Sequence, residues 1–119
     1  MVTTIYSPPD IMSIINTTLA TGTHYYELPD FLRAGSCGLD LLLPAAATVK
    51  AYATLDPDIT ESSDIATICV DISTSFLGAA SLSNVHVMII KDTPYRGRIF
   101  LQVVMASDAA IKILYCKGS

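Results

Sequence analysis

The stretch TVKAYATL, residues 48–55, decides the fold class because its side chains alternate in character. One set is apolar and the other is mostly polar: Val49, Ala51, Ala53 and Leu55 against Thr48, Lys50, Tyr52 and Thr54. A period of two places the two sets on opposite faces of an extended chain. The stretch therefore predicts a β-strand with one buried face.

Similar segments follow one another along the chain, separated by turn residues. The other expected strands are residues 11–18, 23–28, 36–43, 65–72, 85–91, 98–105 and 109–116. Residues 11–18 also fit a helical face capped by Asp10, but their isoleucine and threonine content favours a strand. Asp56-Pro57-Asp58 is expected to form a turn, residues 74–84 a loop, and the last two strands a hairpin.

This even spacing of short strands predicts an all-β fold. We expect an antiparallel β-sandwich of about 7–8 strands, for which a jelly roll is the candidate topology. A small open barrel is the alternative. The 119 residues fit one domain. Residues 1–10, MVTTIYSPPD, are expected to form an extended N-terminal arm because paired prolines lack backbone donors. Residues 11–119 then form the single domain.

The composition indicates that another molecule covers part of the surface. Charged residues make up 15% of the chain, against about 25% in typical domains, and apolar residues make up 51%. So few charges leave apolar area exposed unless a partner covers it. The net charge is −4 and the basic residues are scattered, so contact with nucleic acid is not expected.

The cysteines and the N-terminus predict a protein made in a reducing cytoplasm. Cys37, Cys69 and Cys116 form no CxxC motif and no disulfide framework, so free thiols are expected. Residues 1–10 lack the basic and apolar regions of a secretory signal. The uncharged run 72–90 is long enough to span a membrane, but its many Ser, Thr, Asn and His residues argue against that.

Three C-terminal segments have apolar residues on both faces. Phe100 and Val104 lie on the second face of residues 98–105, and His86, Met88 and Ile90 share one face of residues 85–91. Leu114 and Cys116 lie on the corresponding face of residues 109–116. A sandwich strand ordinarily has one face in water. We therefore expect the outer face to be covered by a loop or by a neighbouring subunit.

No motif of a catalytic, cofactor or metal site accompanies these strands, and the chain is not expected to be an enzyme. His24 and His86 lack the HxH and HxxxH spacings of metal ligands. A nucleophile and base formed by Cys37 or Cys69 with either histidine would have no flanking motif.

Two binding sites stay open as alternatives. The acidic cluster Asp56, Asp58, Glu61 and Asp64 could bind a cation, although it lacks the spacing and glycine of a calcium loop. Tyrosines could form a stacking platform for carbohydrate, although tryptophan is absent. These tyrosines are Tyr6, Tyr25, Tyr26 and Tyr52.

Three segments resemble the head decoration (cement) proteins of tailed bacteriophages and related small β-sandwich structural proteins of virions. They are ATGTHYYELPDF (residues 20–31), LDLLLPAAATVKAYATLD (39–56) and TPYRGRIFLQVV (93–104). In such proteins a Pro-Tyr-Arg segment followed by apolar alternation precedes the final strands, as Pro94, Tyr95, Arg96 and Ile99 do here. The resemblance is one of architecture and carries no catalytic residues.

The resemblance implies a structural protein that binds the major capsid protein, is synthesised in the host cytoplasm and resides on the capsid surface of the virion. It also implies a homo-oligomer, with a trimer favoured, and neither membrane nor nucleic acid as a partner. A tail, neck or fibre-base adaptor and a glycan-binding, adhesin-like module are the alternatives. The expected interface residues lie in the arm and on the C-terminal strands: Ile5, Tyr6, Pro8, Pro9, Ile11, His86, Met88 and Phe100.

Overall fold

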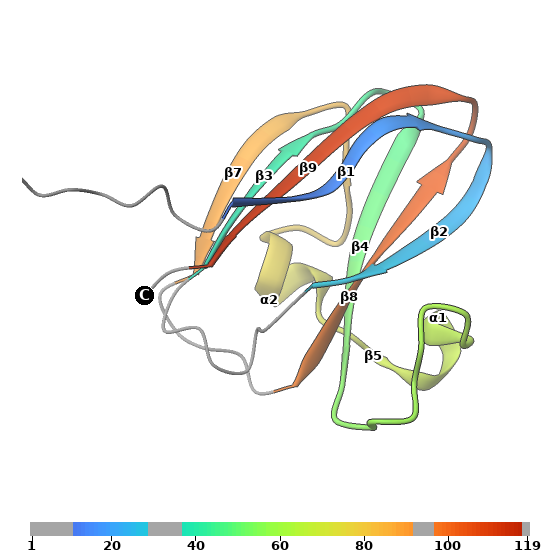
Figure 1. Ribbon diagram of the computed structural model, residues 1–119, viewed down its shortest axis with the longest axis vertical. Helices are drawn as coiled ribbons and strands as arrows, with labels where there is room; N and C mark the ends of the chain where they lie inside the picture. The colour runs from blue at the N-terminus through green and yellow to red at the C-terminus, as the bar shows by residue number, and fades with distance from the viewer. Residues whose placement is uncertain (1–10, 29–36, 92–96, 118–119) are drawn as a thin grey trace, which may run out of the picture.

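Two antiparallel β-sheets form the two main layers of the molecule (Figure 1). The computed structural model describes residues 11–28, 37–91 and 97–117. The predicted all-β sandwich is confirmed. The expected arm, residues 1–10 with Ile5, Tyr6, Pro8 and Pro9, lies outside the described residues.

The strand orders of the two sheets define the topology. The four-stranded sheet has the order β1-β9-β3-β7, with β1 at Ile11–Leu19, β9 at Ala109–Lys117, β3 at Cys37–Leu42 and β7 at His86–Lys91. The second sheet has the order β2-β8-β4-β5, with β2 at Gly22–Glu27, β8 at Arg98–Met105, β4 at Ala47–Thr54 and β5 at Val70–Asp71. The short strand β6, Leu82–Ser83, also pairs with β4.

This order is that of a jelly roll with a reduced fifth strand. An eight-stranded jelly roll has the sheet orders 1-8-3-6 and 2-7-4-5. The chain matches these orders when the two-residue strands β5 and β6 together count as the fifth. Counted separately, they raise the number of strands in the described residues to nine, slightly above the expected number.

The core lies between the sheets and follows the period of two. Val49 and Ala51 of β4 are fully buried, as their alternation predicted, and so is Ala47, which precedes the predicted strand. They pack with alternate residues of β3, β8 and β9 in one cluster. Leu55, expected on the same face, is 78% exposed because β4 ends at Thr54.

The connection between β4 and β7 differs from its prediction. Residues 65–72, expected as one strand, form α1 (Ile65–Ile68) followed by the two-residue β5. The alternation of a strand here would place Ile68 and Val70 on its inner face, but both are exposed, whereas Ile65 is fully buried. The expected loop 74–84 contains most of α2 (Ser73–Leu77) and all of β6. Neither helix in the described ranges is long and apolar enough to cross a membrane.

The last two long strands do not form the expected hairpin. β8 pairs with β2 and β4, and β9 pairs with β1 and β3, so the chain crosses from one sheet to the other between them. The turn between β1 and β2 also passes from one sheet to the other, beside the connection between β8 and β9. Thr21 donates to Asp108 Oδ1 from its backbone nitrogen at 2.8 Å and from its hydroxyl at 2.9 Å. These bonds join the two crossings and lower the pKa of Asp108.

A buried serine replaces part of the missing fifth strand. β6 pairs with Thr48 and Val49, and β5 pairs with Tyr52 and Ala53, which leaves the peptide of Ala51 between them. The hydroxyl of Ser73 accepts from Ala51 N at 2.9 Å and donates to Ala51 O at 3.3 Å. The single hydroxyl proton of Ser73 can turn to the Asp71 carboxylate instead of Ala51 O, and the backbone nitrogen of Ser73 donates to Asp71 Oδ1 at 2.8 Å. These two interactions lower the pKa of Asp71.

Ser73→Ala is expected to lower the free energy of unfolding by about 1–3 kcal/mol, because it leaves the buried Ala51 N–H without its acceptor. Ser75→Ala is the matched control. It removes an exposed hydroxyl that donates to Ile72 O, and it should change the stability by less than about 0.5 kcal/mol. Urea denaturation measures both. Equal losses in the two variants would contradict the role given to Ser73.

Candidate interaction surface

The outer face of the second sheet is covered by the chain itself. Tyr52 of β4 and Phe100 of β8 point outward from this sheet, yet they are buried against Ile59 and Ile65. Residues 55–69, here called the covering segment, therefore form a second, smaller core on this face. Of the two covers considered from the sequence, a loop and a neighbouring subunit, the loop accounts for Phe100.

Phe100 is accordingly not a surface residue of the folded chain, and its expected place at an interface is wrong. Its exposed fraction is 0%. The apolar second face of β8 was correctly recognised, but the sequence pattern contains no information on which part of the chain lies over it. Val104, on the same face of β8 beyond the covering segment, is 37% exposed.

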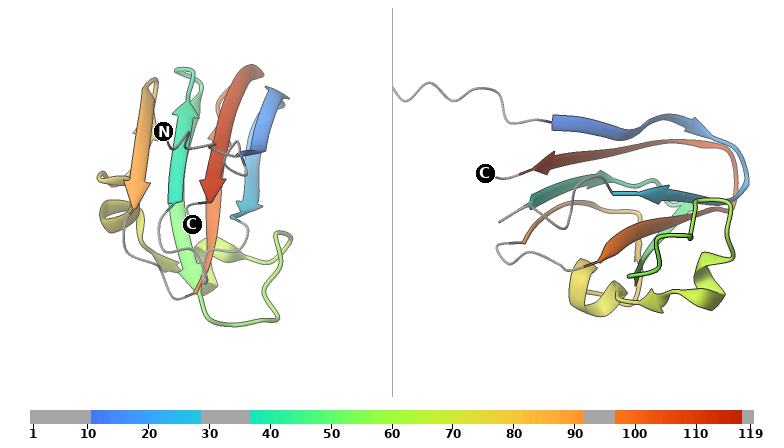
Figure 2. Two further views of the ribbon diagram at one scale, coloured as in Figure 1. Left: turned by 60° about the vertical axis from the view of Figure 1, so that its left-hand side comes forward. Right: turned by 60° about the horizontal axis from the view of Figure 1, so that its bottom comes forward.

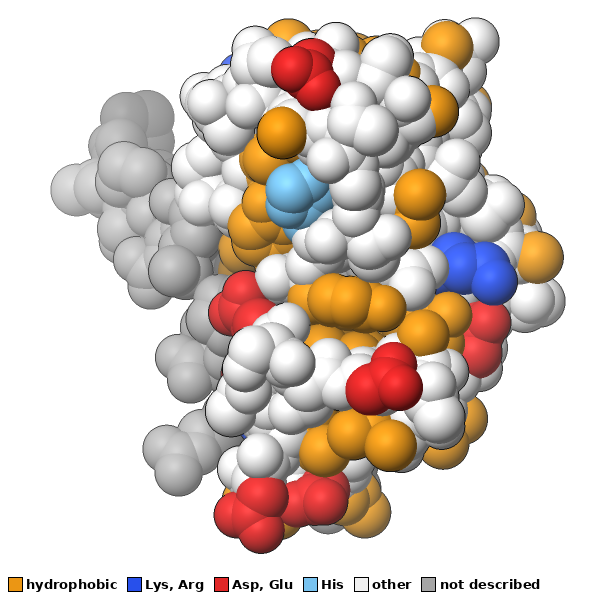
Figure 3. Space-filling view, turned by 90° about the vertical axis from the view of Figure 1, so that its right-hand side faces the viewer, with side chains coloured by type: hydrophobic (Ala, Val, Ile, Leu, Met, Phe, Trp, Pro, Cys, Tyr) orange, Lys and Arg blue, Asp and Glu red, His pale blue; other side chains and the backbone are white. Residues whose placement is uncertain are grey.

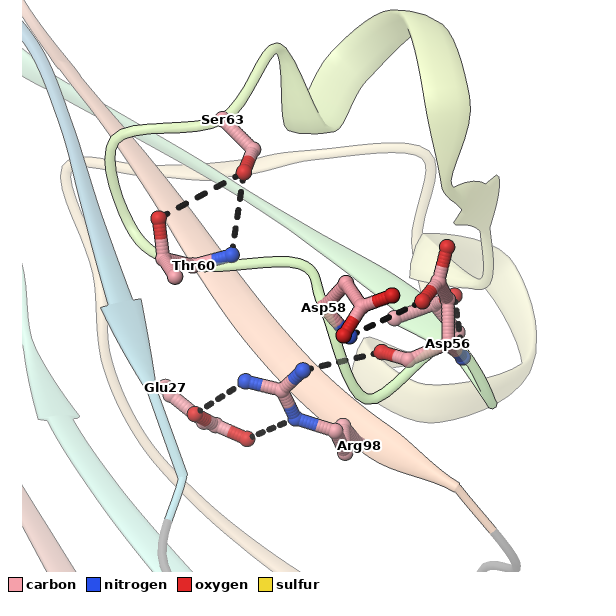
Figure 4. A network of polar contacts seen from close by, with 7 residues as sticks. Glu27, Asp56, Asp58, Thr60, Ser63 and Arg98 are labelled. Carbon is pink, nitrogen blue, oxygen red and sulfur yellow. Dashed lines mark hydrogen bonds and ion pairs between the residues drawn. The ribbon is translucent and has the colours of Figure 1, made fainter.

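An arginine fastens the covering segment to the sheet (Figure 4). Arg98 donates from Nε and Nη2 to the two carboxylate oxygens of Glu27, at 2.6 and 2.8 Å, and from Nη1 to Asp56 O at 2.9 Å. Its guanidinium carbon also lies 5.1 Å from the centroid of the Phe100 ring. The bonds to Glu27 raise the pKa of Arg98. These contacts give Arg98 a structural role.

Polar side chains of the covering segment accept hydrogen bonds from backbone nitrogens and so stabilise its turns. Asp56 Oδ1 accepts from Asp58 N at 2.9 Å, as expected for the Asp-Pro-Asp turn, and Ser63 Oγ accepts from Thr60 N at 2.9 Å (Figure 4). Among the residues that the structure describes, no three His, Cys, Asp or Glu side chains come together as a metal site. The cation site considered for this cluster therefore gains no support.

The described tyrosines Tyr25, Tyr26 and Tyr52 do not all share one face, and Tyr6 lies outside the described residues. Tyr25 and Tyr26 are neighbours in β2, so their side chains point to opposite sides of the sheet. Tyr25 Oη accepts from Gln102 Nε2 at 2.9 Å, Tyr26 packs against the main core, and Tyr52 is buried. On the side of α1, Figure 3 shows apolar groups separated by acidic and other polar side chains. These positions do not form the proposed carbohydrate platform.

The histidines and described thiols are also separated. His24 lies in the second sheet, where its Nε2 is 2.8 Å from Ala20 O, whereas His86 lies in the four-stranded sheet. Cys69 packs against the second core, and its burial raises the pKa of its thiol, which is the opposite of what a nucleophile needs. The side chain of Cys37 lies outside the described part.

The outer face of the four-stranded sheet is different, because apolar side chains remain exposed there. The register aligns its outward residues in three rows across β7, β3 and β9: Ile90–Gly38–Cys116, Met88–Asp40–Leu114 and His86–Leu42–Lys112. Met88 is 69% exposed, Ile90 63% and Leu42 46%. We call the residues of these three rows the apolar face.

Two hollows shape this face. One, of about 160 Å³, lies over Gly38 between Met88 and Leu114. It exists partly because Gly38 has no side chain, and a Cβ there would lie 3.9 Å from Cys116 Cβ, at ordinary contact distance. The other, of about 290 Å³, lies beside Leu42 and Lys112. Hollows of this volume can accept side chains of a partner surface.

The polar groups of the apolar face are Asp40 at its centre and His86 and Lys112 at the two ends of one outer row. Asp40 lies between Met88 and Leu114 in the middle row, and its Oδ1 is 2.8 Å from His86 Nε2. Lys112 occupies the corner of the face beyond Leu42. An exposed apolar patch with a few polar groups is typical of a protein-binding surface.

The residues expected at an interface from the sequence do not all lie on the apolar face. His86 and Met88 lie together on the apolar face, while Ile11 begins β1 opposite Cys116, with its side chain outside the described part. Leu42 was missed. Its signal was the run Leu41-Leu42-Leu43, in which the buried first and third leucines force the second to the outside.

Comparisons with protein-family models, with curated proteins and with solved structures find no match for this chain.

Proposed function

We propose that this protein is a non-enzymatic structural subunit that binds a preassembled protein shell, as a decoration protein on the capsid of a tailed phage. The observation that carries the proposal is the apolar face, where Leu42, Met88 and Ile90 are exposed and where Met88 lines the hollow over Gly38. The resemblance of three segments to decoration proteins supplies the identity of the shell. Its binding partner would be the major capsid protein, and its location the virion surface.

A decoration protein stabilises a shell by linkage. A protein that binds the assembled shell better than the free subunits shifts the equilibrium toward the shell. Contacts of this kind need a preformed surface more than a strong individual site. The sandwich presents the apolar face on three adjacent strands of a four-stranded hydrogen-bonded sheet, which holds it rigidly.

Leu42→Glu is expected to weaken binding to the shell at least about tenfold, because it places a charge on the face that loses water on contact. Val70→Glu is the matched control, since Val70 is also exposed and apolar but lies in β5 on the other sheet. Cosedimentation with particles that lack the protein measures binding, and their thermal disruption measures stabilisation.

Equal binding by the Leu42→Glu and Val70→Glu chains would exclude the apolar face as the contact. Shells equally stable with and without bound protein would reject the decoration role. The copy number in purified particles separates the alternative, because hundreds of copies are expected on a shell and a dozen or fewer for a tail, neck or fibre-base adaptor.

A further inference from the structure

The two edge strands of the four-stranded sheet differ in how they are protected. β1, at one edge, has a β-bulge between Ser13 and Ile15 and exposed polar residues at Asn16 and Thr17. Bulges and polar residues are devices that prevent a sheet edge from pairing with another chain. β7, at the other edge, runs His-Val-Met-Ile-Ile-Lys in unbroken register with β3 and contains no proline. In Figure 2 (left) it is the outermost arrow of its sheet.

The phase of the β3–β7 ladder shows which peptide groups of β7 face this edge. Leu43 N donates to Val85 O at 2.8 Å, so these opposed residues form a hydrogen-bonded pair. Antiparallel pairs alternate between hydrogen-bonded and non-hydrogen-bonded. Val87, Ile89 and Lys91 therefore direct their peptide groups toward β3. His86, Met88 and Ile90 direct theirs away from it, and within the described ranges β7 pairs with β3 alone.

We infer that β7 pairs antiparallel with β7 of a second copy of this chain, about a two-fold axis at Met88. This register places Met88 opposite Met88 of the second copy, and His86 opposite Ile90 of the second copy. All three positions direct peptide groups to the edge, so each opposed pair exchanges two hydrogen bonds. Shifting the register by one residue would turn the exposed side chains of one copy to the buried side of the other.

The charges of the strand agree with self-pairing. β7 contains no acidic residue, and its only lysine, Lys91, stands at its end. In the inferred register the two Lys91 residues lie about 20 Å apart along the strands, beyond the Debye length of about 8 Å in physiological salt. The net charge of −4 therefore comes from residues outside β7, and the pairing brings no acidic side chain to the contact.

A second copy is favoured over an unrelated strand because both the sheet and its apolar face then continue across the two-fold axis. Pairing joins two four-stranded sheets into one continuous sheet. Met88, which stands exposed at the edge of the apolar face, then comes beside Met88 of the second copy, and the exposed Ile90 comes beside its His86. The two apolar faces become one surface of twice the width.

The test is the oligomeric state in solution, measured by size-exclusion chromatography with light scattering at tens of micromolar protein. A dimer is expected. Met88→Pro should weaken it about tenfold to a hundredfold while the circular dichroism stays that of the folded chain, because the amide that it removes faces the edge and is not part of the ladder with β3. Met88→Ala keeps the amide and should remain largely dimeric.

Met88→Cys provides a second readout. Residues opposed across the axis have Cα atoms about 5.5 Å apart, within disulfide range, so this variant should form covalent dimers on mild oxidation. Val70→Cys, with a similarly exposed parent side chain, should not exceed the wild-type background from the native cysteines. A wild-type monomer or the trimer implied by the resemblance would overturn the pairing, as would dissociation by Met88→Ala equal to that by Met88→Pro. The inference does not rest on shell binding, which the Leu42→Glu experiment tests separately.

Discussion

Phe100→Ala is expected to lower the free energy of unfolding by about 3–5 kcal/mol. Phe100 is fully buried between β8 and the covering segment, where its ring contacts the cluster of Tyr52, Ile59 and Ile65. Its removal leaves a cavity that the sheet side cannot fill, since β8 is held by β2 and β4 on its two edges. The aromatic surface below the Arg98 guanidinium is lost as well.

Thermal and urea denaturation measure this loss. Val104→Ala is the matched control because it changes the same face of the same strand at a position that is 37% exposed, and it should cost less than about 1 kcal/mol. A Phe100→Ala chain of unchanged stability that binds partners less tightly would indicate that Phe100 is a surface residue. The covering segment would then not lie over β8.

Phe76→Ala is expected to cost a similar amount, about 3–5 kcal/mol, for a different reason. Phe76 lies in α2, is fully buried and belongs to the main core between the sheets. The short helix thus contributes a core side chain where the fifth strand is reduced. Lys91 holds the helix from β7, since its Nζ donates to Ser75 O at 2.8 Å and lies 5.9 Å from the centroid of the Phe76 ring.

The control for Phe76 is Thr74→Ala, an exposed position in the same helix, for which a change below about 0.5 kcal/mol is expected. Denaturation followed by near-ultraviolet and far-ultraviolet circular dichroism tests both variants. If the two variants lost equally little stability, residues 73–77 would be a surface loop, as their serine-rich sequence suggested.

The sequence predicted those strands in which one face meets the core. In β4 and β9 the residues of the main core follow a period of two, because the sheet pleat alone determines which side chains face inward. The same reasoning failed for residues 65–72. Their apolar alternation resembles a strand, but the buried residue is Ile65, held by a helical turn in which Cys69 N donates to Ile65 O.

The candidate site could be predicted only in part for a related reason. A strand with two apolar faces indicates that something lies over the second face, but the pattern is the same whether the cover belongs to the chain or to another molecule. Phe100 and Met88 look alike in this respect, and the structure separates them: the covering segment lies over the first and leaves the second exposed. That distinction depends on contacts between residues far apart in sequence, which local alternation does not contain.

The pairing of β1 with β9 sets the order of events during synthesis. These strands come from opposite ends of the described chain, and β9 lies between β1 and β3. Ile11–Leu19 therefore has no neighbour in its sheet until residues 109–117 have left the ribosome. Such long-range closure is characteristic of slow folding, on the millisecond to second scale, and it leaves nascent apolar strands open to chaperones in the meantime.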